Sequence, residues 1–154
     1  MLERLFPARA DNGFGGYRAA LWLLGLFVAL KLVMGLNSIF NTASVAQGAD
    51  GIPLDSFPPA AARAVLTLFA LTALGQLMLA LTAAVALVRY RALVPLVYLA
   101  LLAEQLARRF IVQANSVSPG GGGSGAWYFN TALAAVLALG LLLSLLPARP
   151  RGAP

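Results

Sequence analysis

Cysteine and histidine are both absent from this chain of 154 residues. Without cysteine there is no disulfide framework, no thiol nucleophile and no thiolate metal ligand. Without histidine the chain also lacks the commonest general base and a usual ligand of haem, zinc and copper. We therefore predict no catalytic residue, no metal site and no cofactor.

Charged residues are also scarce. They make up 10% of the chain, hydrophobic residues make up 60%, and the mean hydropathy is +0.84. An ordinary soluble domain is about half apolar and a quarter charged. Here the apolar residues are gathered into long runs, and a bilayer span needs ~20 of them. The composition predicts a small multi-pass membrane protein whose first partner is the lipid bilayer.

Four runs are long enough to cross a bilayer, at about 17–36, 64–88, 92–112 and 126–146. The predicted fold is all-α: an integral membrane four-helix bundle, antiparallel and up-and-down. Residues 1–16 are predicted to form an N-terminal segment, 17–146 the membrane domain and 147–154 a C-terminal tail. The first run is expected to be retained as a span, because the small-residue cleavage pattern at Ser44 and Ala46 lies too far beyond its apolar stretch for a signal peptide.

The connections between these runs differ in composition. Residues 37–59 carry no basic residue but several apolar ones, so we predict an outer loop that is partly packed; a lid or a partner-docking element is the functional alternative. The turn Arg89-Tyr90-Arg91 is too short for anything but a tight hairpin. Residues 113–125 contain four consecutive glycines, which predicts a flexible linker.

The net charge of +6 comes from arginines that flank the spans. No basic stripe with interleaved aromatic residues is present, so we predict no nucleic-acid partner. With a cytoplasmic N-terminus, seven arginines fall inside and three fall outside; these are Arg4, Arg9, Arg18, Arg89, Arg91, Arg149 and Arg151, against Arg63, Arg108 and Arg109. The positive-inside rule therefore predicts that both termini are cytoplasmic.

Two ionisable residues fall inside the predicted spans, Lys31 and Glu104. Counted from the starts of their spans at ~1.5 Å per residue, they lie ~21 and ~18 Å from the inner surface, which is nearly one level. Arg108 follows Glu104 by one helical turn and shares its face. An ionisable residue within a span is a functional-site hypothesis by default.

We therefore predict a polar cluster in the outer half of the bundle, beneath the first loop, with Arg63 and Thr131 near its level. Its candidate members are Lys31, Glu104, Arg108, Arg109 and Asn130, with Asp50 and Asp55 as candidate contacts from the loop. The alternative is that Lys31 extends toward the interface alone and that Glu104 only pairs with Arg108 there. The sequence leaves both interpretations open.

Three stretches resemble a family of small bacterial four-span inner-membrane proteins that has no assigned activity. They are Leu36–Asn41 (LNSIFN), Ala49–Phe57 (ADGIPLDSF) and Arg89–Pro95 (RYRALVP). The resemblance covers most of the chain up to the arginine pair at 108 and 109. It implies a multi-pass protein of the bacterial inner membrane and implies no catalytic residue.

Three classes of function remain open. A non-enzymatic accessory or assembly subunit of a membrane complex needs only spans, small-residue helix faces and a docking loop, and it could act with a partner protein or a second copy of itself. A small transporter or channel would use the cluster around Glu104, although Arg108 neutralises that acid. An intramembrane lipid or quinone enzyme would have to work without histidine or cysteine.

Overall fold

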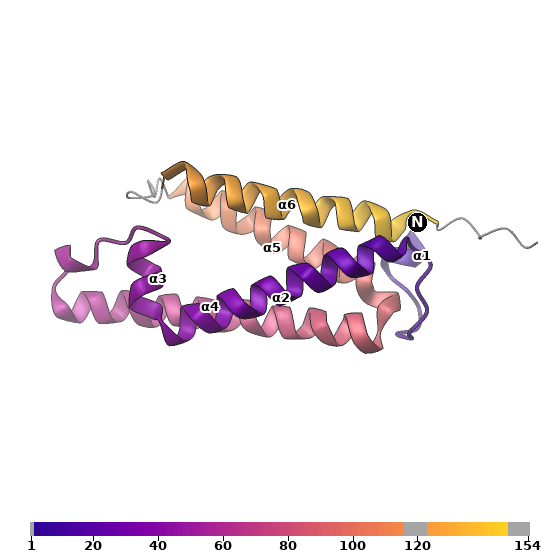
Figure 1. The fold of residues 1–154 in the computed structure, drawn as a ribbon, viewed down its shortest axis with the longest axis horizontal. Helices are drawn as coiled ribbons and strands as arrows, with labels where there is room; N and C mark the ends of the chain where they lie inside the picture. Colours follow the sequence, from indigo (N-terminus) through magenta and orange to yellow (C-terminus); the bar gives the residue numbers. More distant parts are fainter. Residues whose placement is uncertain (1, 116–122, 148–154) are drawn as a thin grey trace, which may run out of the picture.

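The computed structural model describes residues 2–115 and 123–147 (Figure 1). Within them a short helix α1 (Leu2–Leu5) precedes four long helices, which are α2 (Arg18–Phe40), α4 (Pro59–Arg89), α5 (Val94–Ala114) and α6 (Gly123–Leu145). The short helix α3 (Thr42–Gly48) and the 3-10 helix η1 (Leu54–Ser56) join α2 to α4, and the 3-10 helix η2 (Arg91–Leu93) joins α4 to α5. The long helices pack antiparallel, so the predicted all-α architecture is confirmed.

Three helices of the described residues are long and apolar enough to cross a membrane. These are α2, α4 and the Tyr128–Leu145 part of α6. The fourth long helix, α5, has 21 residues, which matches the length of a span. Its second half carries Glu104, Arg108 and Arg109, so its composition does not identify it as one.

Proline and short turns set several helix ends as predicted. Pro59 is the first residue of α4 and Pro95 lies in the first turn of α5, where a missing N–H costs no helical hydrogen bond. Tyr90 alone separates α4 from η2, which confirms the tight hairpin. The predicted linker is shorter than expected, because α5 runs to Ala114 and α6 begins at Gly123; residues 116–122 lie outside the described part of the chain.

A core of buried apolar side chains joins the four long helices. Its members are Ala20, Leu24, Phe27, Val28, Ala83, Val94, Tyr98, Leu101, Leu133 and Leu137. Tyr98 is the largest fully buried side chain, and its hydroxyl donates to the Ala20 carbonyl at 2.6 Å. A Cβ at Gly140 would overlap the Tyr98 ring. Glycine at this position therefore lets α6 approach α5 closely, as small residues do between membrane helices.

One end of the bundle, which we call the hairpin end, contains Tyr90 and is closed by the N-terminal segment. The Tyr17 N–H donates to the Leu143 carbonyl at 3.0 Å, and the Ala92 N–H donates to the Asp11 carbonyl at 3.2 Å. The Arg4 guanidinium reaches the Leu145 carbonyl at 3.2 Å. These bonds hold the N-terminal segment against α6 and η2 at the hairpin end.

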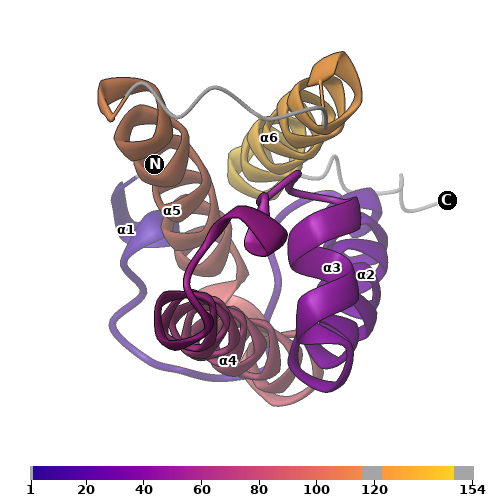
Figure 2. The ribbon, with the colours of Figure 1, turned by 90° about the vertical axis from the view of Figure 1, so that its left-hand side faces the viewer.

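The opposite end, which we call the α3 end, is covered in part by the connection between α2 and α4 (Figure 2). Ala46 in α3 is 0% exposed and Leu54 in η1 is 7% exposed. The Ile52 N–H donates to the Ala46 carbonyl at 2.9 Å, which folds the segment back on itself. The connection is therefore packed against the helices, as its apolar residues predict.

Candidate functional site

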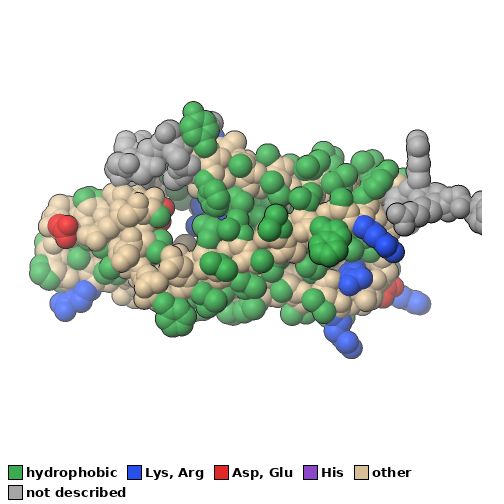
Figure 3. Space-filling model, in the orientation of Figure 1, with side chains coloured by type: hydrophobic (Ala, Val, Ile, Leu, Met, Phe, Trp, Pro, Cys, Tyr) green, Lys and Arg blue, Asp and Glu red, His purple; other side chains and the backbone are tan. Residues whose placement is uncertain are grey.

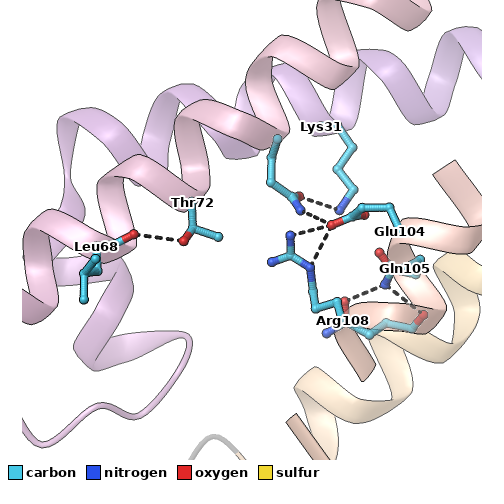
Figure 4. A network of polar contacts seen from close by, with 8 residues as sticks. Lys31, Leu68, Thr72, Glu104, Gln105 and Arg108 are labelled. Atoms are coloured by element: carbon cyan, nitrogen blue, oxygen red, sulfur yellow. Dashed lines mark hydrogen bonds and ion pairs between the residues drawn. The ribbon is translucent and has the colours of Figure 1, made fainter. Parts of the chain in front are cut away.

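Polar side chains from three helices meet at one level of the bundle (Figure 4). Lys31 lies on α2, Gln76 on α4 and Glu104 on α5. The first two are each about thirteen residues from the hairpin end of their helix, or ~20 Å at the helical rise, and Glu104 is about ten residues, or ~15 Å, from the start of α5. Antiparallel packing brings these three positions together.

A chain of hydrogen bonds connects these side chains. The Lys31 ammonium donates to Gln76 Oε1 at 3.2 Å, and Gln76 Nε2 donates to Glu104 Oε1 at 2.7 Å. Arg108 donates to the same carboxylate oxygen through Nε at 3.1 Å and Nη2 at 2.6 Å. We call Lys31, Gln76, Glu104 and Arg108 the α2/α4/α5 network. Lys31 and Glu104, both predicted members of one cluster, are thus joined through Gln76.

The network is partly accessible. The side chains of Arg108 and Glu104 are 40% and 31% exposed. The Lys31 ammonium also lies 5.7 Å from the centre of the Phe27 ring, a distance at which a cation is attracted to the ring face. Lys31 therefore has two neighbours within the bundle and does not extend toward an interface alone.

The other two predicted members, Arg109 of α5 and Asn130 of α6, take part in contacts between these two helices. Gln105 Nε2 donates to the side-chain oxygen of Asn130 at 3.0 Å and to its carbonyl at 3.5 Å. Arg109 donates to Thr131 Oγ1 at 2.8 Å. The structure therefore divides the predicted cluster into the α2/α4/α5 network and an α5/α6 group of Gln105, Arg109, Asn130 and Thr131.

The residues expected from the first loop and from α4 have different positions. Asp50 lies just after α3, where burial raises the pKa of its carboxyl and the positive charge of Arg108 lowers it in part. Asp55 is exposed, and Gln47 donates to it at 3.5 Å. Arg63 is exposed about thirteen residues before Gln76, or ~20 Å along α4. It lies away from the network because α4 begins at Pro59 and extends beyond the predicted span.

Sequence reasoning missed two residues that the structure makes central, Gln76 and Gln105. Gln76 is the only strongly polar residue in the apolar run of the second span, a signal that could have identified it as a partner for Lys31. Gln105 is 4% exposed, and its Oε1 atom has no hydrogen-bond partner. It follows Glu104 directly and precedes Arg108 by three residues, and its place in this charged stretch gave no sign that it would be buried.

A separate hollow of about 390 Å³ lies at the hairpin end, lined by Ala10, Asn12, Val88, Arg89 and Tyr90. Arg89 is its one charged residue, and all but Tyr90 of these residues are exposed. Among the residues that the structure describes, no group of three or more Asp or Glu residues is placed to hold a metal ion. The α2/α4/α5 network with its neighbour Gln105 is therefore the strongest candidate site.

Comparisons with protein-family models, with curated proteins and with solved structures found no match to this chain.

Proposed function

We propose that this chain is a four-span protein of the bacterial inner membrane, with both termini in the cytoplasm, that serves as a non-enzymatic accessory or assembly subunit of a membrane complex. The fourth span in this proposal is α5. Its polar side chains have partners on neighbouring helices: Glu104 with Gln76, Gln105 with Asn130 and Arg109 with Thr131. Ionisable residues can lie within a bilayer when they are paired inside the bundle.

The distribution of side chains on α4 supports a membrane location. The buried residues of this 31-residue helix are Ala73, Ala80, Ala83 and Ala86. Large apolar residues face outward instead, which is the reverse of a soluble helix. Within a bundle, membrane helices contact each other mainly through small residues, so large apolar side chains are left to face lipid or a further helix. Apolar side chains cover the middle of the molecule, and basic side chains gather at the hairpin end (Figure 3), which is consistent with a cytoplasmic location for that end.

The observation that carries the subunit role is a seam on the outer face of α4. Its members are exposed and alternate in spacings of three and four residues: Leu71, Leu74, Met78, Leu81, Val85 and Val88. This spacing is that of the contact positions of a coiled coil, which insert between the side chains of a facing helix. A Cβ at Gly75, beside the seam, would meet nothing within 4 Å, so a second helix has room to approach.

Transport is less well supported. A proton-coupled exporter needs a membrane-embedded acid that is free to exchange protons. Three hydrogen bonds converge on Glu104 Oε1, two of them from the cationic Arg108. This carboxylate is therefore already bonded to side chains of its own bundle, whereas the acid of an exporter has to be available to its substrate and to protons.

Site-specific cross-linking in intact membranes tests the subunit role. A photo-reactive residue at Met78, in the seam, should give one discrete protein adduct, whereas the same residue at Leu142, which is 60% exposed on α6, should give lipid adducts. An adduct with a second copy of the chain would identify a homo-oligomer. Lipid adducts alone at both positions would refute the subunit role.

Reporter fusions test the topology separately. A reporter that works only in the cytoplasm should be active when fused after Pro154, because both termini are proposed to be inside. A periplasmic phosphatase fused at the same position should be inactive. Phosphatase activity there would refute the proposed orientation and leave the cross-linking result unaffected.

A further inference from the structure

The α3 end of the bundle contains a cleft whose walls are polar. From the hairpin end, α5 and α6 diverge from α4 toward the α3 end (Figure 1). The space-filling view shows a hollow there, between the α3 segment and α6, with basic and acidic side chains at its edge (Figure 3). Between these helices Lys31 of α2 and Gln76 of α4 face Glu104 and Arg108 of α5, and Gln105 follows Glu104 along α5.

One buried acceptor in this region, Gln105 Oε1, lacks a hydrogen-bond donor. Gln105 is 4% exposed, and its Oε1 atom is buried without a hydrogen bond. The backbone carbonyl of Asn130 can only accept a hydrogen bond, so the side-chain nitrogen of Gln105 must face it. This contact sets the orientation of the Gln105 amide and directs its oxygen away from Asn130. An unpaired buried acceptor destabilises the folded state and is rare in native proteins. The atom therefore indicates a missing donor.

The neighbouring side chains have further capacity. Figure 4 shows the side-chain oxygen of Gln105, Oε1, on the side of α5 that also carries Glu104. The described bonds to Glu104 all reach Oε1, which leaves Oε2 as an acceptor, and Arg108 donates through Nε and Nη2, which leaves Nη1 as a donor. Lys31 uses one of its three protons for Gln76. Two acceptors thus lie beside two cationic donors.

We propose that this cleft binds one glycerophospholipid whose headgroup carries a hydrogen-bond donor as well as its phosphate, with phosphatidylethanolamine as the best match. The ammonium of the headgroup donates to Gln105 Oε1 and Glu104 Oε2, while Arg108 and Lys31 hold the phosphate. The side chains of Glu104 and Arg108 are 31% and 40% exposed, so a headgroup can reach the carboxylate and the guanidinium. The proposal rests on the membrane location of the chain and not on its role as a subunit.

The choice of headgroup follows from the missing donor. Phosphatidylcholine has the same phosphate, but its quaternary ammonium has no N–H to give. A site that needed only an anion would bind both lipids equally through Arg108 and Lys31. A site that must also satisfy the Gln105 acceptor discriminates between them, since one hydrogen bond to a charged donor corresponds to about a tenfold difference in affinity.

The test compares the full chain in nanodiscs of dioleoyl phosphatidylcholine with nanodiscs in which half of that lipid is replaced by dioleoyl phosphatidylethanolamine. We expect the melting temperature to be higher by about 3 °C in the mixed discs. Native mass spectrometry should show one retained phosphatidylethanolamine, favoured about tenfold over phosphatidylcholine. Equal melting temperatures together with equal retention would overturn the proposal.

Two variants separate this site from the general properties of the bilayer. Gln105→Met removes the acceptor at similar volume and should abolish the preference for phosphatidylethanolamine. Gln113→Leu, a change at an exposed glutamine on the same helix, should retain it. A preference that survives in Gln105→Met would overturn the proposal. If that variant does not fold, the retention measured on the wild-type chain decides alone.

A soluble headgroup provides the last control. Free glycerophosphoethanolamine carries the same phosphodiester and ammonium but no acyl chains. Added to phosphatidylcholine nanodiscs, it should leave the melting temperature unchanged, because the cleft is proposed to be filled from the bilayer. A shift equal to that given by the lipid would overturn the assignment to a membrane lipid.

Discussion

Neutralising Glu104 should weaken the bundle by an amount that the structure allows to be estimated. In Glu104→Gln the amide oxygen can still accept from Gln76, so the main loss is the charge that faces Arg108 at 2.6 and 3.1 Å. A hydrogen bond between charged groups contributes ~1.5–3 kcal/mol. Because the two side chains are 31% and 40% exposed, screening reduces this contribution to about 1.5 kcal/mol. The melting temperature in mild detergent should fall by about 5 °C.

The same assay can show that the network is continuous. Lys31 and Glu104 are connected through Gln76, so the double variant of Lys31→Met and Glu104→Gln should lose about 0.5 kcal/mol less than the sum of the single variants. In a Gln76→Leu background this coupling should vanish. Asp55→Asn, which neutralises an exposed carboxylate, should change the melting temperature by less than about 1 °C. Additive effects in the wild-type background, or a Glu104→Gln change no larger than that of Asp55→Asn, would refute the network.

Three further predictions concern other parts of the chain. Tyr98→Phe removes the hydroxyl that donates to the Ala20 carbonyl and should cost about 1 kcal/mol in thermal unfolding. Gly140→Ala should cost about 1–3 kcal/mol, because its methyl group overlaps the Tyr98 ring; the double variant Gly140→Ala, Tyr98→Leu should recover part of that loss. Burial raises the pKa of the Asp50 carboxyl above its ordinary value of 3.8, so the folded state favours the protonated form. The corresponding contribution to stability is complete below pH 3.8 and is lost as the pH rises through the higher pKa of the folded state. Asp50→Asn should accordingly be more stable than wild type at neutral pH and equal to it in acid, and a variant less stable at neutral pH would show that the attraction to Arg108 dominates instead.

Much of the architecture followed from run lengths, since spans and turns are set by local composition. Counting residues from the starts of the first and third runs placed Lys31 and Glu104 at one level, and Gln76 now connects them. What counting along each helix could not give is rotation about the helix axis. Arg109 of α5 and Asn130 of α6 lie near the level of the network but make contacts between α5 and α6 instead, because only packing decides which way a helix face turns.

The ends of the bundle were less predictable for a related reason. The N-terminal segment has no apolar periodicity, and its position depends on single backbone bonds such as that from Tyr17 to Leu143. The first residues of α4 extend past the predicted span, because an apolar run marks where lipid begins and not where a helix ends. Both features depend on partners that are distant in sequence.

The bond between Tyr17 and Leu143 has a consequence for the order in which the protein is made. Roughly 130 residues separate the two partners, and a ribosome that adds ~5–20 residues per second needs about ten seconds to synthesise them. During that time α2 has left the ribosome, but the peptide groups at its start have no α6 to contact. The contacts of α2 are therefore completed only when α6 has been made, and a chain truncated before residue 143 would leave the Tyr17 N–H without this partner.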